Sequence, residues 1–178
     1  VTALSNVLDM AEWQAKLRIT VAFATDGSWI KGKGAARAFF RHDGEYESGM
    51  LDEPEGEDNY IAELVALLDA LSSLASGERV LIVVDALSPL WALRRFSHSH
   101  DRVKQQFYCD DLLSQLASQV ARAEAVVFFW QTSHAGSPAN EIADLLAGVE
   151  ENLGSTSRVV RERSPHYHIS LAAPSRSV

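Results

Sequence analysis

The sequence predicts a single α/β domain built on a five-stranded mixed sheet, in which three antiparallel strands are followed by two parallel strands and helices flank the sheet. Three observations support this fold class. The first part of the chain carries short β-type segments separated by turns. The remainder alternates helical patterns with two short, nearly continuous apolar runs. A chain of 178 residues, of which 47% are hydrophobic, can bury the core of one such domain.

The first elements predict an antiparallel meander. Residues 3–16 have the spacing of a short amphipathic helix. Ile19 to Ala24 is rich in β-branched and aromatic residues, which predicts a buried strand that ends at the turn Asp26-Gly27. Ala36 to Arg41 and Tyr46 to Met50 are joined by a glycine-containing loop, which indicates a β-hairpin.

From Asn59 the pattern becomes that of helices alternating with strands. Apolar residues recur on one helical face from Asn59 to about Gly77. Arg79 to Val84 is a nearly continuous apolar run, as expected of a strand covered on both faces. Ala125 to Thr132 predicts the last strong strand. Further helices are predicted from Pro89 to Arg95, from Asp110 to Arg122 and from Ala139 to Val149.

The two ends of the chain are predicted to flank a domain at residues 18–150. Residues 1–17 are expected to form a helical extension, and residues 151–178 a tail in which His166 to Ile169 is a candidate short strand. No apolar run approaches the roughly 20 residues of a membrane-spanning helix, and acidic residues interrupt any N-terminal secretory segment. The single cysteine, Cys109, fits a reducing compartment. We therefore expect a cytoplasmic monomer that does not bind a membrane.

Charge is distributed unevenly along the chain. A net charge of −8 repels nucleic acid at long range. Acidic residues crowd the segment Asp52 to Asp58, which we interpret as a solvated loop. Four cations nevertheless gather in a short segment, so that a local basic surface is expected on an acidic protein; they are Arg94, Arg95, Arg102 and Lys104.

Four acidic residues lie at or near the boundaries of different predicted elements: Asp26, Glu63, Asp85 and Asp144. Each has an ordinary structural interpretation, because Asp-Gly is a common turn and an aspartate after a strand often caps a helix. Carboxylates from such distant parts of a chain nevertheless suggest a divalent-cation site that the fold assembles, since Mg²⁺ prefers oxygen ligands.

These residues and their neighbours resemble the ribonuclease H family, type 1. The most specific part of the resemblance is the segment from His134 to Asp144, which Trp130 precedes at the end of a strand. The segment Thr25 to Ser28, with the sequence TDGS, matches as well. The order of the predicted elements agrees with the ribonuclease H-like fold, so motif and topology indicate the same family over roughly residues 19–149.

The resemblance implies a metal-dependent endoribonuclease that hydrolyses the RNA strand of RNA:DNA hybrids with two Mg²⁺ ions, Mn²⁺ being an alternative. Two ions about 4 Å apart can activate the attacking water and neutralise the leaving oxygen. Asp26 would bridge the ions, Glu63 and Asp85 would complete one site, and Asp144 would hold the other. His134 corresponds to a histidine that helps to move protons or to release product, and an ordinary pKa of about 6.5 suits that role.

The resemblance also implies substrate-binding residues, and here the chain departs from the family. Asn59 matches the first of two asparagines that often read the minor groove, but Tyr60 replaces the second. Ala86-Leu87 stand where polar residues usually follow the strand-end aspartate. The shortened glycine-rich stretch keeps two lysines. The candidate substrate-binding residues are Ser28, Lys31, Lys33, Asn59, Arg94, Arg95 and Asn140.

Two other functions stay open at this point. A nucleic-acid-binding module of the same fold, with weak nuclease activity or none, is the first, because Ala86-Leu87 and the acidic loop could disturb substrate docking. A nuclease of this fold that acts on DNA junctions is the second. The presence of all four carboxylates favours an enzyme, and the motif that begins at His134 favours type 1.

Overall fold

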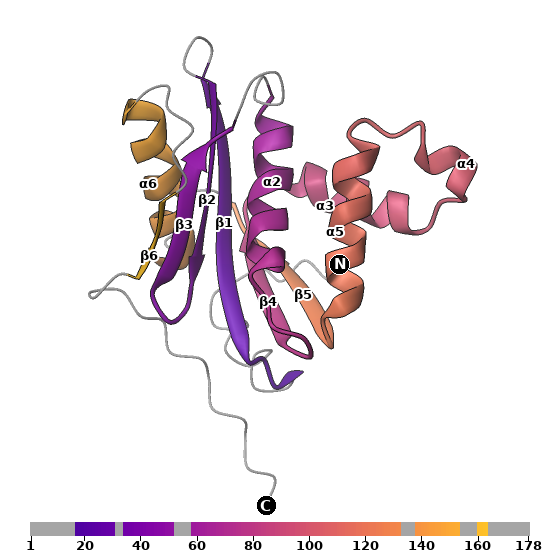
Figure 1. The fold of residues 1–178 in the computed structure, drawn as a ribbon, viewed down its shortest axis with the longest axis horizontal. Helices are drawn as coiled ribbons and strands as arrows, with labels where there is room; N and C mark the ends of the chain where they lie inside the picture. Colours follow the sequence, from indigo (N-terminus) through magenta and orange to yellow (C-terminus); the bar gives the residue numbers. More distant parts are fainter. Residues whose placement is uncertain (1–16, 31–33, 52–57, 133–137, 154–159, 164–178) are drawn as a thin grey trace, which may run out of the picture.

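The computed structural model describes residues 17–30, 34–51, 58–132, 138–153 and 160–163. Their helices and strands form one sheet with helices on both of its faces (Figure 1). In chain order the elements are β1 (Val21–Ile30), β2 (Gly34–Arg41), β3 (Glu45–Met50), α2 (Asn59–Ser72), β4 (Arg79–Val84), α3 (Leu87–Ser97), α4 (Asp101–Lys104), α5 (Asp110–Arg122), β5 (Ala125–Trp130), α6 (Pro138–Leu153) and β6 (Val160–Arg163).

The sheet is mixed, as predicted, but within the described residues it has six strands in the order β5-β4-β1-β2-β3-β6. The strands β1, β2, β3 and β6 pair antiparallel, and β4 pairs parallel with both β1 and β5. The expected number of five strands was wrong because β6 has no apolar pattern of its own. Its four residues, Val-Arg-Glu-Arg, become a strand by pairing with the edge of β3. Residues 3–16 and His166 to Ile169 lie outside the described residues.

The first strand is also longer than predicted, because Asp26-Gly27 is not a turn. β1 continues to Ile30, and β2 pairs with it along this whole extension, with Asp26 opposite Ala38 and Ile30 opposite Gly34. On its other side, β1 pairs with β4 only as far as Ala24. At Asp26, therefore, β1 is still paired with β2, whereas its pairing with β4 has ended.

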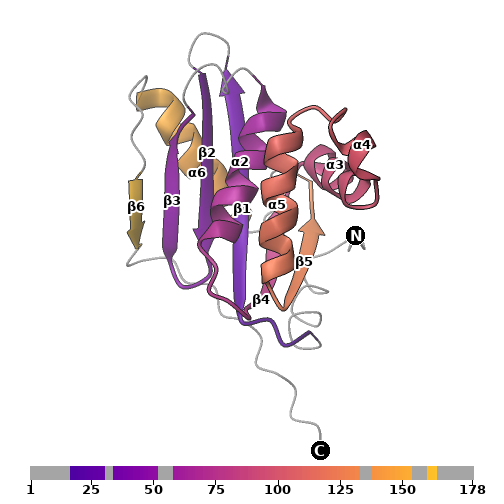
Figure 2. The same cartoon turned by 45° about the vertical axis from the view of Figure 1, so that its right-hand side comes forward.

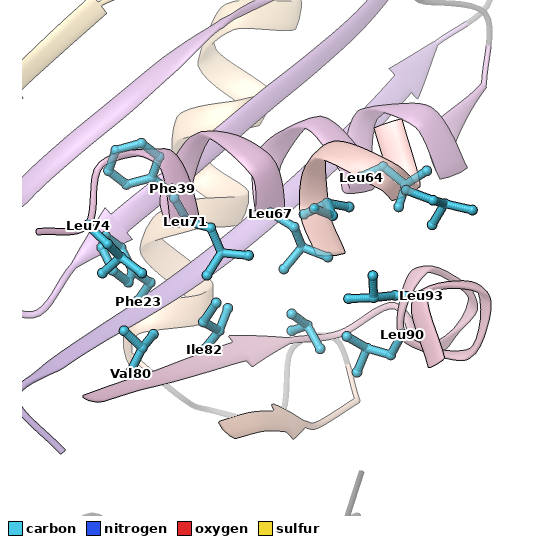
Figure 3. Packing of buried hydrophobic residues seen from close by; sticks show 14 of the residues in the cluster. Phe23, Phe39, Leu64, Leu67, Leu71, Leu74, Val80, Ile82, Leu90 and Leu93 are labelled. Atoms are coloured by element: carbon cyan, nitrogen blue, oxygen red, sulfur yellow. The ribbon is translucent and has the colours of Figure 1, made fainter. Parts of the chain in front are cut away.

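One face of the sheet packs against α2, α3 and α5 (Figure 2). Large aliphatic residues of α2, among them Leu64, Leu67 and Leu71, meet Phe23 of β1 and Ile82 of β4 in this core (Figure 3). These residues recur three and four positions apart, so that they form a single stripe along the helix. α2 is therefore held firmly against the centre of the sheet.

An ion pair reinforces the position of α2. Arg37 of β2 is buried, and its Nε atom lies 2.7 Å from the Asp69 carboxylate of α2. The Arg37 side chain also lies 3.6 Å from Glu47 of β3. Burial raises the pKa of Asp69, whereas the charge of Arg37 acts in the opposite direction. The pair thus ties α2 to two neighbouring strands.

The opposite face of the sheet packs against α6. Its core contains Ala24 of β1 and Leu81, Val83 and Phe129 of β4 and β5, with small residues of α6. Among the described residues, no helix is long and apolar enough to cross a bilayer.

Candidate functional site

The pairing of β1 with β4 determines where two of the predicted acidic residues lie. The last pair in this parallel register is Ala24 with Val83, so Asp26 and Asp85 each stand two residues farther along. Side chains alternate along strands, which places both aspartates on the side of the sheet that carries Ala24 and Val83. The end of β4 therefore brings two carboxylates from neighbouring strands together.

The third acidic residue, Glu63, comes from the opposite side, on α2. The Asp58 side chain caps this helix by accepting a hydrogen bond from the Tyr60 N–H at 2.9 Å. A Cβ atom at Gly27 would lie 2.2 Å from the Glu63 nitrogen and 2.3 Å from the Ala62 carbonyl carbon. The start of α2 thus packs directly on the backbone of β1, which only a glycine permits at this position.

The three carboxylates form one cluster. One oxygen from each of Asp26, Glu63 and Asp85 lies within 4.8 Å of the others, a separation at which a single cation can contact all three. Asp26 and Glu63 are buried, and Asp85 is half-buried. This donor set of hard oxygen ligands fits Mg²⁺ or Mn²⁺.

Electrostatics explain why a cation would be favourable here. Burial raises the pKa of Glu63 well above its ordinary value, and the charges of Asp26 and Asp85 raise it further. A hydrogen bond from the Gly27 N–H to the Glu63 carboxylate acts in the opposite direction. A divalent cation would neutralise the repulsion that these three groups exert on one another.

Asp144 is not a member of this close cluster. It lies on α6, half-buried, four residues after Asn140 and next to Ala143. Asn140 is buried, and its Oδ1 atom has no hydrogen-bond partner among the described residues. α6 packs on β1 and β2, so Asp144 belongs to the helix that covers the side of the sheet on which Asp26 and Asp85 lie. Its role as a metal ligand stays a prediction.

One contact at the site was not predicted from the sequence. The Trp130 indole N–H donates a hydrogen bond of 2.9 Å to the backbone carbonyl of Asp85. The Gln131 N–H donates to the Val84 carbonyl at 3.0 Å, so the end of β5 fixes the backbone that carries Asp85. The only signal in the sequence was the position of Trp130 at a strand end, where a core aromatic residue is the ordinary interpretation.

The predicted substrate-binding residues are only partly described. Ser28 lies in β1 opposite Ala36 and is half-buried, and Asn59 is exposed at the first residue of α2. Arg94 and Arg95 are exposed on α3. Lys31, Lys33 and His134 lie outside the described residues.

A groove of about 510 Å³ adjoins the start of α2. It is formed by α2, α3 and the segment before α5, and its lining residues are Asp58, Tyr60, Ser88, Trp91, Ala92, Arg95, Phe107 and Tyr108. The sequence marks Tyr60 only as a substitution for an asparagine, and nothing in the sequence predicts that it shares a groove with the exposed Trp91. Tyr60 lies three residues before Glu63, so the groove is next to the carboxylate cluster along α2.

Aromatic rings and cations are paired within and beside this groove. The Tyr60 and Tyr108 rings are stacked, with centroids 5.9 Å apart and planes 25° from parallel. The Arg95 guanidinium lies 5.8 Å from the centroid of Phe107, and that of Arg94 lies 5.6 Å from the centroid of Trp91. Burial, together with the neighbouring Cys109, Asp58 and Tyr108, raises the pKa of Tyr60 to about 12, so its hydroxyl stays protonated.

Comparison with known proteins agrees with the geometry. The chain matches the family model of RNase H over residues 18–151, which is most of its length. No curated protein matches the chain. The matched region contains the carboxylate cluster, Asp144 and the groove, in a mixed sheet with helices on both faces. On the basis of this match, the chain belongs to the ribonuclease H family.

Proposed function

We propose that this protein is a metal-dependent endoribonuclease that hydrolyses the RNA strand of RNA:DNA hybrids. The observation that carries the proposal is the cluster of Asp26, Glu63 and Asp85, whose oxygens lie within 4.8 Å of one another in a chain of the ribonuclease H family. An ordinary surface group of carboxylates would not have two of its three members buried.

We propose a role for each of the site residues. Asp26, Glu63 and Asp85 would hold the first cation, and Asp144 on α6 would hold the second. Bound divalent cations would activate the attacking water and neutralise the leaving 3′-oxygen. The Gly27 N–H, which donates a hydrogen bond to the Glu63 carboxylate, would favour its charged, cation-binding form. His134 would move a proton during hydrolysis or product release.

The residues of the groove beside α2 have the chemistry needed to bind a nucleic-acid substrate. Aromatic rings can pack against bases and sugars, and arginines can bind the phosphates between them. Trp91 and Tyr108 are exposed, and Arg94 and Arg95 are held against aromatic rings on the same side of the molecule. We propose that one strand of the hybrid lies along this groove, with Asn59 and Ser28 near the scissile strand.

A second function, binding of nucleic acid without efficient cleavage, is favoured by one observation. Ala86-Leu87 follow Asp85, where the family usually has polar residues. If the hybrid docked poorly at the carboxylates for this reason, the groove would still bind substrate while hydrolysis stayed slow. Measuring binding and cleavage on the same hybrid separates the two functions.

The test is a cleavage assay with end-labelled RNA:DNA hybrid, duplex DNA and duplex RNA, each in Mg²⁺, in Mn²⁺ and in EDTA. We expect cuts in the RNA strand of the hybrid only, in either metal and not in EDTA. Asp26→Asn, purified in the same way, is the control for a contaminating nuclease. Tight binding of the hybrid without any cleavage would support the second function, and cleavage of duplex DNA would contradict both.

A further inference from the structure

The face of the sheet opposite α2 is covered unevenly by the described helices. α6 packs mainly on β1 and β2, less on β3, only marginally on β4, and still less on β5. Figure 1 shows α6 beside the half of the sheet that contains β2 and β3, away from β5. The half of this face formed by β4 and β5 therefore needs another cover.

The side chains on this half are nevertheless buried. Leu81, Val83 and Phe129 are at most 2% exposed. Among the described side chains of α6, only Ala139 and Ala143 belong to their cluster, and two methyl groups cannot shield three large residues of two strands. The other described members from outside the strands are Leu17 and Ile19, which come from the chain just before β1.

The contacts of Leu17 show where the preceding segment leaves the fold. The Leu17 carbonyl accepts a hydrogen bond of 2.7 Å from Arg79 Nε, at the first residue of β4. Arg79 also pairs with Glu124, which immediately precedes β5. Residue 17 is thus fixed at the edge where β4 and β5 both begin, and residues 1–16 start from that edge.

The length and pattern of this segment match the face. A helix of residues 3–16 would be about 21 Å long at 1.5 Å per residue. The six residues of β4 or β5 extend for about 20 Å at 3.3 Å per residue. In helical geometry five apolar residues fall on one side and four polar residues fall outside it; the apolar ones are Leu4, Val7, Leu8, Ala11 and Ala15, and the polar ones are Ser5, Asp9, Glu12 and Lys16. Trp13 departs from this pattern, because it lies opposite the apolar side.

We propose that residues 3–16 form an amphipathic helix that docks its apolar side on the part of the sheet marked by Leu81, Val127 and Phe129. This helix lies beside α6 as the second cover of this face, and the N-terminal segment is part of the domain core. The proposal does not depend on nuclease activity.

The experiment uses two cysteine reporters in the full-length chain, with Cys109→Ser as the background. Val127→Cys reports on the proposed docking face, because Val127 packs in the cluster of Leu81 and Phe129. Val126→Cys is the matched reporter, because Val126 is also half-buried but packs in the core on the α2 side. The rate of reaction with a thiol reagent is measured at both positions.

Two substitutions in the N-terminal segment are compared. Leu8→Asp puts a charge on the apolar side, and Ser5→Asp puts the same charge on the polar side. We expect Leu8→Asp to accelerate labelling of Val127→Cys by roughly tenfold, because a carboxylate cannot stay docked against apolar side chains. Ser5→Asp should leave this rate unchanged, and labelling of Val126→Cys should change in neither variant.

Three results would overturn the proposal. They are equal labelling of Val127→Cys with and without Leu8→Asp, equal acceleration at both reporters, and labelling that depends on protein concentration, which would identify a second copy as the cover. If Leu8→Asp does not fold, Leu8→Ala is measured with the same reporters, and a smaller acceleration confined to Val127→Cys is expected.

Discussion

The two helices that pack on β1 do so in different ways. α2 presents Leu64, Leu67 and Leu71, is tied to β2 through Asp69, and touches the β1 backbone at Gly27. α6 presents small residues to the opposite face. The carboxylate of α2, Glu63, is buried in the close cluster, whereas Asp144 of α6 is half-buried and outside it. The backbone contact at Gly27 thus positions the carboxylate of α2 within the cluster, whereas the carboxylate of α6 stands apart from it.

The largest expected effect is the loss of hydrolysis when a proposed ligand of either cation, Asp26 or Asp144, is neutralised. Asp26→Asn and Asp144→Asn should each keep the fold and each lower kcat by about a thousandfold, because an amide lacks the charge that holds the cation. Calorimetric titration with Mg²⁺ sharpens the comparison. Asp26→Asn should lose binding at the three-carboxylate site, whereas Asp144→Asn should retain it. Hydrolysis by Asp26→Asn at the wild-type rate in saturating Mg²⁺ would exclude the proposed metal centre.

The second prediction compares the stability effects of alanine at Gly27, which contacts α2, and at Gly148, which lies on α6. Gly27→Ala should destabilise the protein by about 3 kcal/mol or more, because a methyl group there overlaps the α2 backbone. Gly148→Ala on α6 is the matched control, since a Cβ atom there meets nothing within 4 Å. It should stabilise the protein by about 1 kcal/mol, as alanine favours a helix. Urea unfolding measures both, and equal effects would remove the distinction between the helices.

The third prediction tests whether substrate is held on the α2 side. Replacing both Arg94 and Arg95 by alanine should raise KM for the hybrid several-fold and leave kcat nearly unchanged, because phosphate contacts bind ground and transition states alike. The slope of log KM against log salt should fall by roughly 0.9 for each lost contact. Replacing Arg122 and Arg163 by alanine removes the same charge elsewhere and should change neither quantity. An unchanged KM in the variant that lacks Arg94 and Arg95 would show that the substrate is bound outside the groove.

The smallest expected effect is a pH dependence near the start of β1. His42 Nδ1 accepts a hydrogen bond of 3.2 Å from the Ala22 N–H, which requires a neutral ring. Burial lowers the pKa of His42, and the charge of Arg41 lowers it further, against opposing contributions from Asp43, the Ala22 backbone and Glu78. A folded-state pKa below the unfolded value means that stability is complete above about pH 6.5 and is lost as the pH falls through the folded-state pKa.

His42→Gln is the variant that isolates this effect. It removes the titrating ring, so the free energy of unfolding should decline less between pH 8 and pH 5 than in the wild type. Urea unfolding at several pH values in this range gives the difference. Parallel curves for the two proteins would show that the ring does not contribute to the pH dependence.

The sequence was most informative where local pattern and tertiary environment agree. The bounds predicted for β4 and α5, Arg79 to Val84 and Asp110 to Arg122, are those of the structure, because continuous burial and a single apolar stripe leave few alternatives. β6 and the extension of β1 to Ile30 could not be predicted in this way, because pairing with β3 and β2 creates them. A turn signal such as Asp-Gly is a local preference that strand pairing can overrule.

At the candidate site, too, local sequence patterns identify residues but do not predict their tertiary contacts. The acidic residues were identified by their motifs, and the structure brings Asp26, Glu63 and Asp85 together through the register of β1 with β4 and the contact of α2 with Gly27. The stack of Tyr60 on Tyr108 joins residues from distant segments. No periodicity or composition could predict which rings meet there.

The spacing of the clustered carboxylates along the chain has a thermodynamic consequence. Asp26, Glu63 and Asp85 come from three elements, so an unfolded chain has no preformed site, and a cation that needs all three binds the native state alone. Each tenfold rise in free cation above its dissociation constant would then add about 1.4 kcal/mol to the free energy of unfolding. The melting temperature of the substrate-free protein thereby becomes a gauge of cation occupancy, and chelation would lower it.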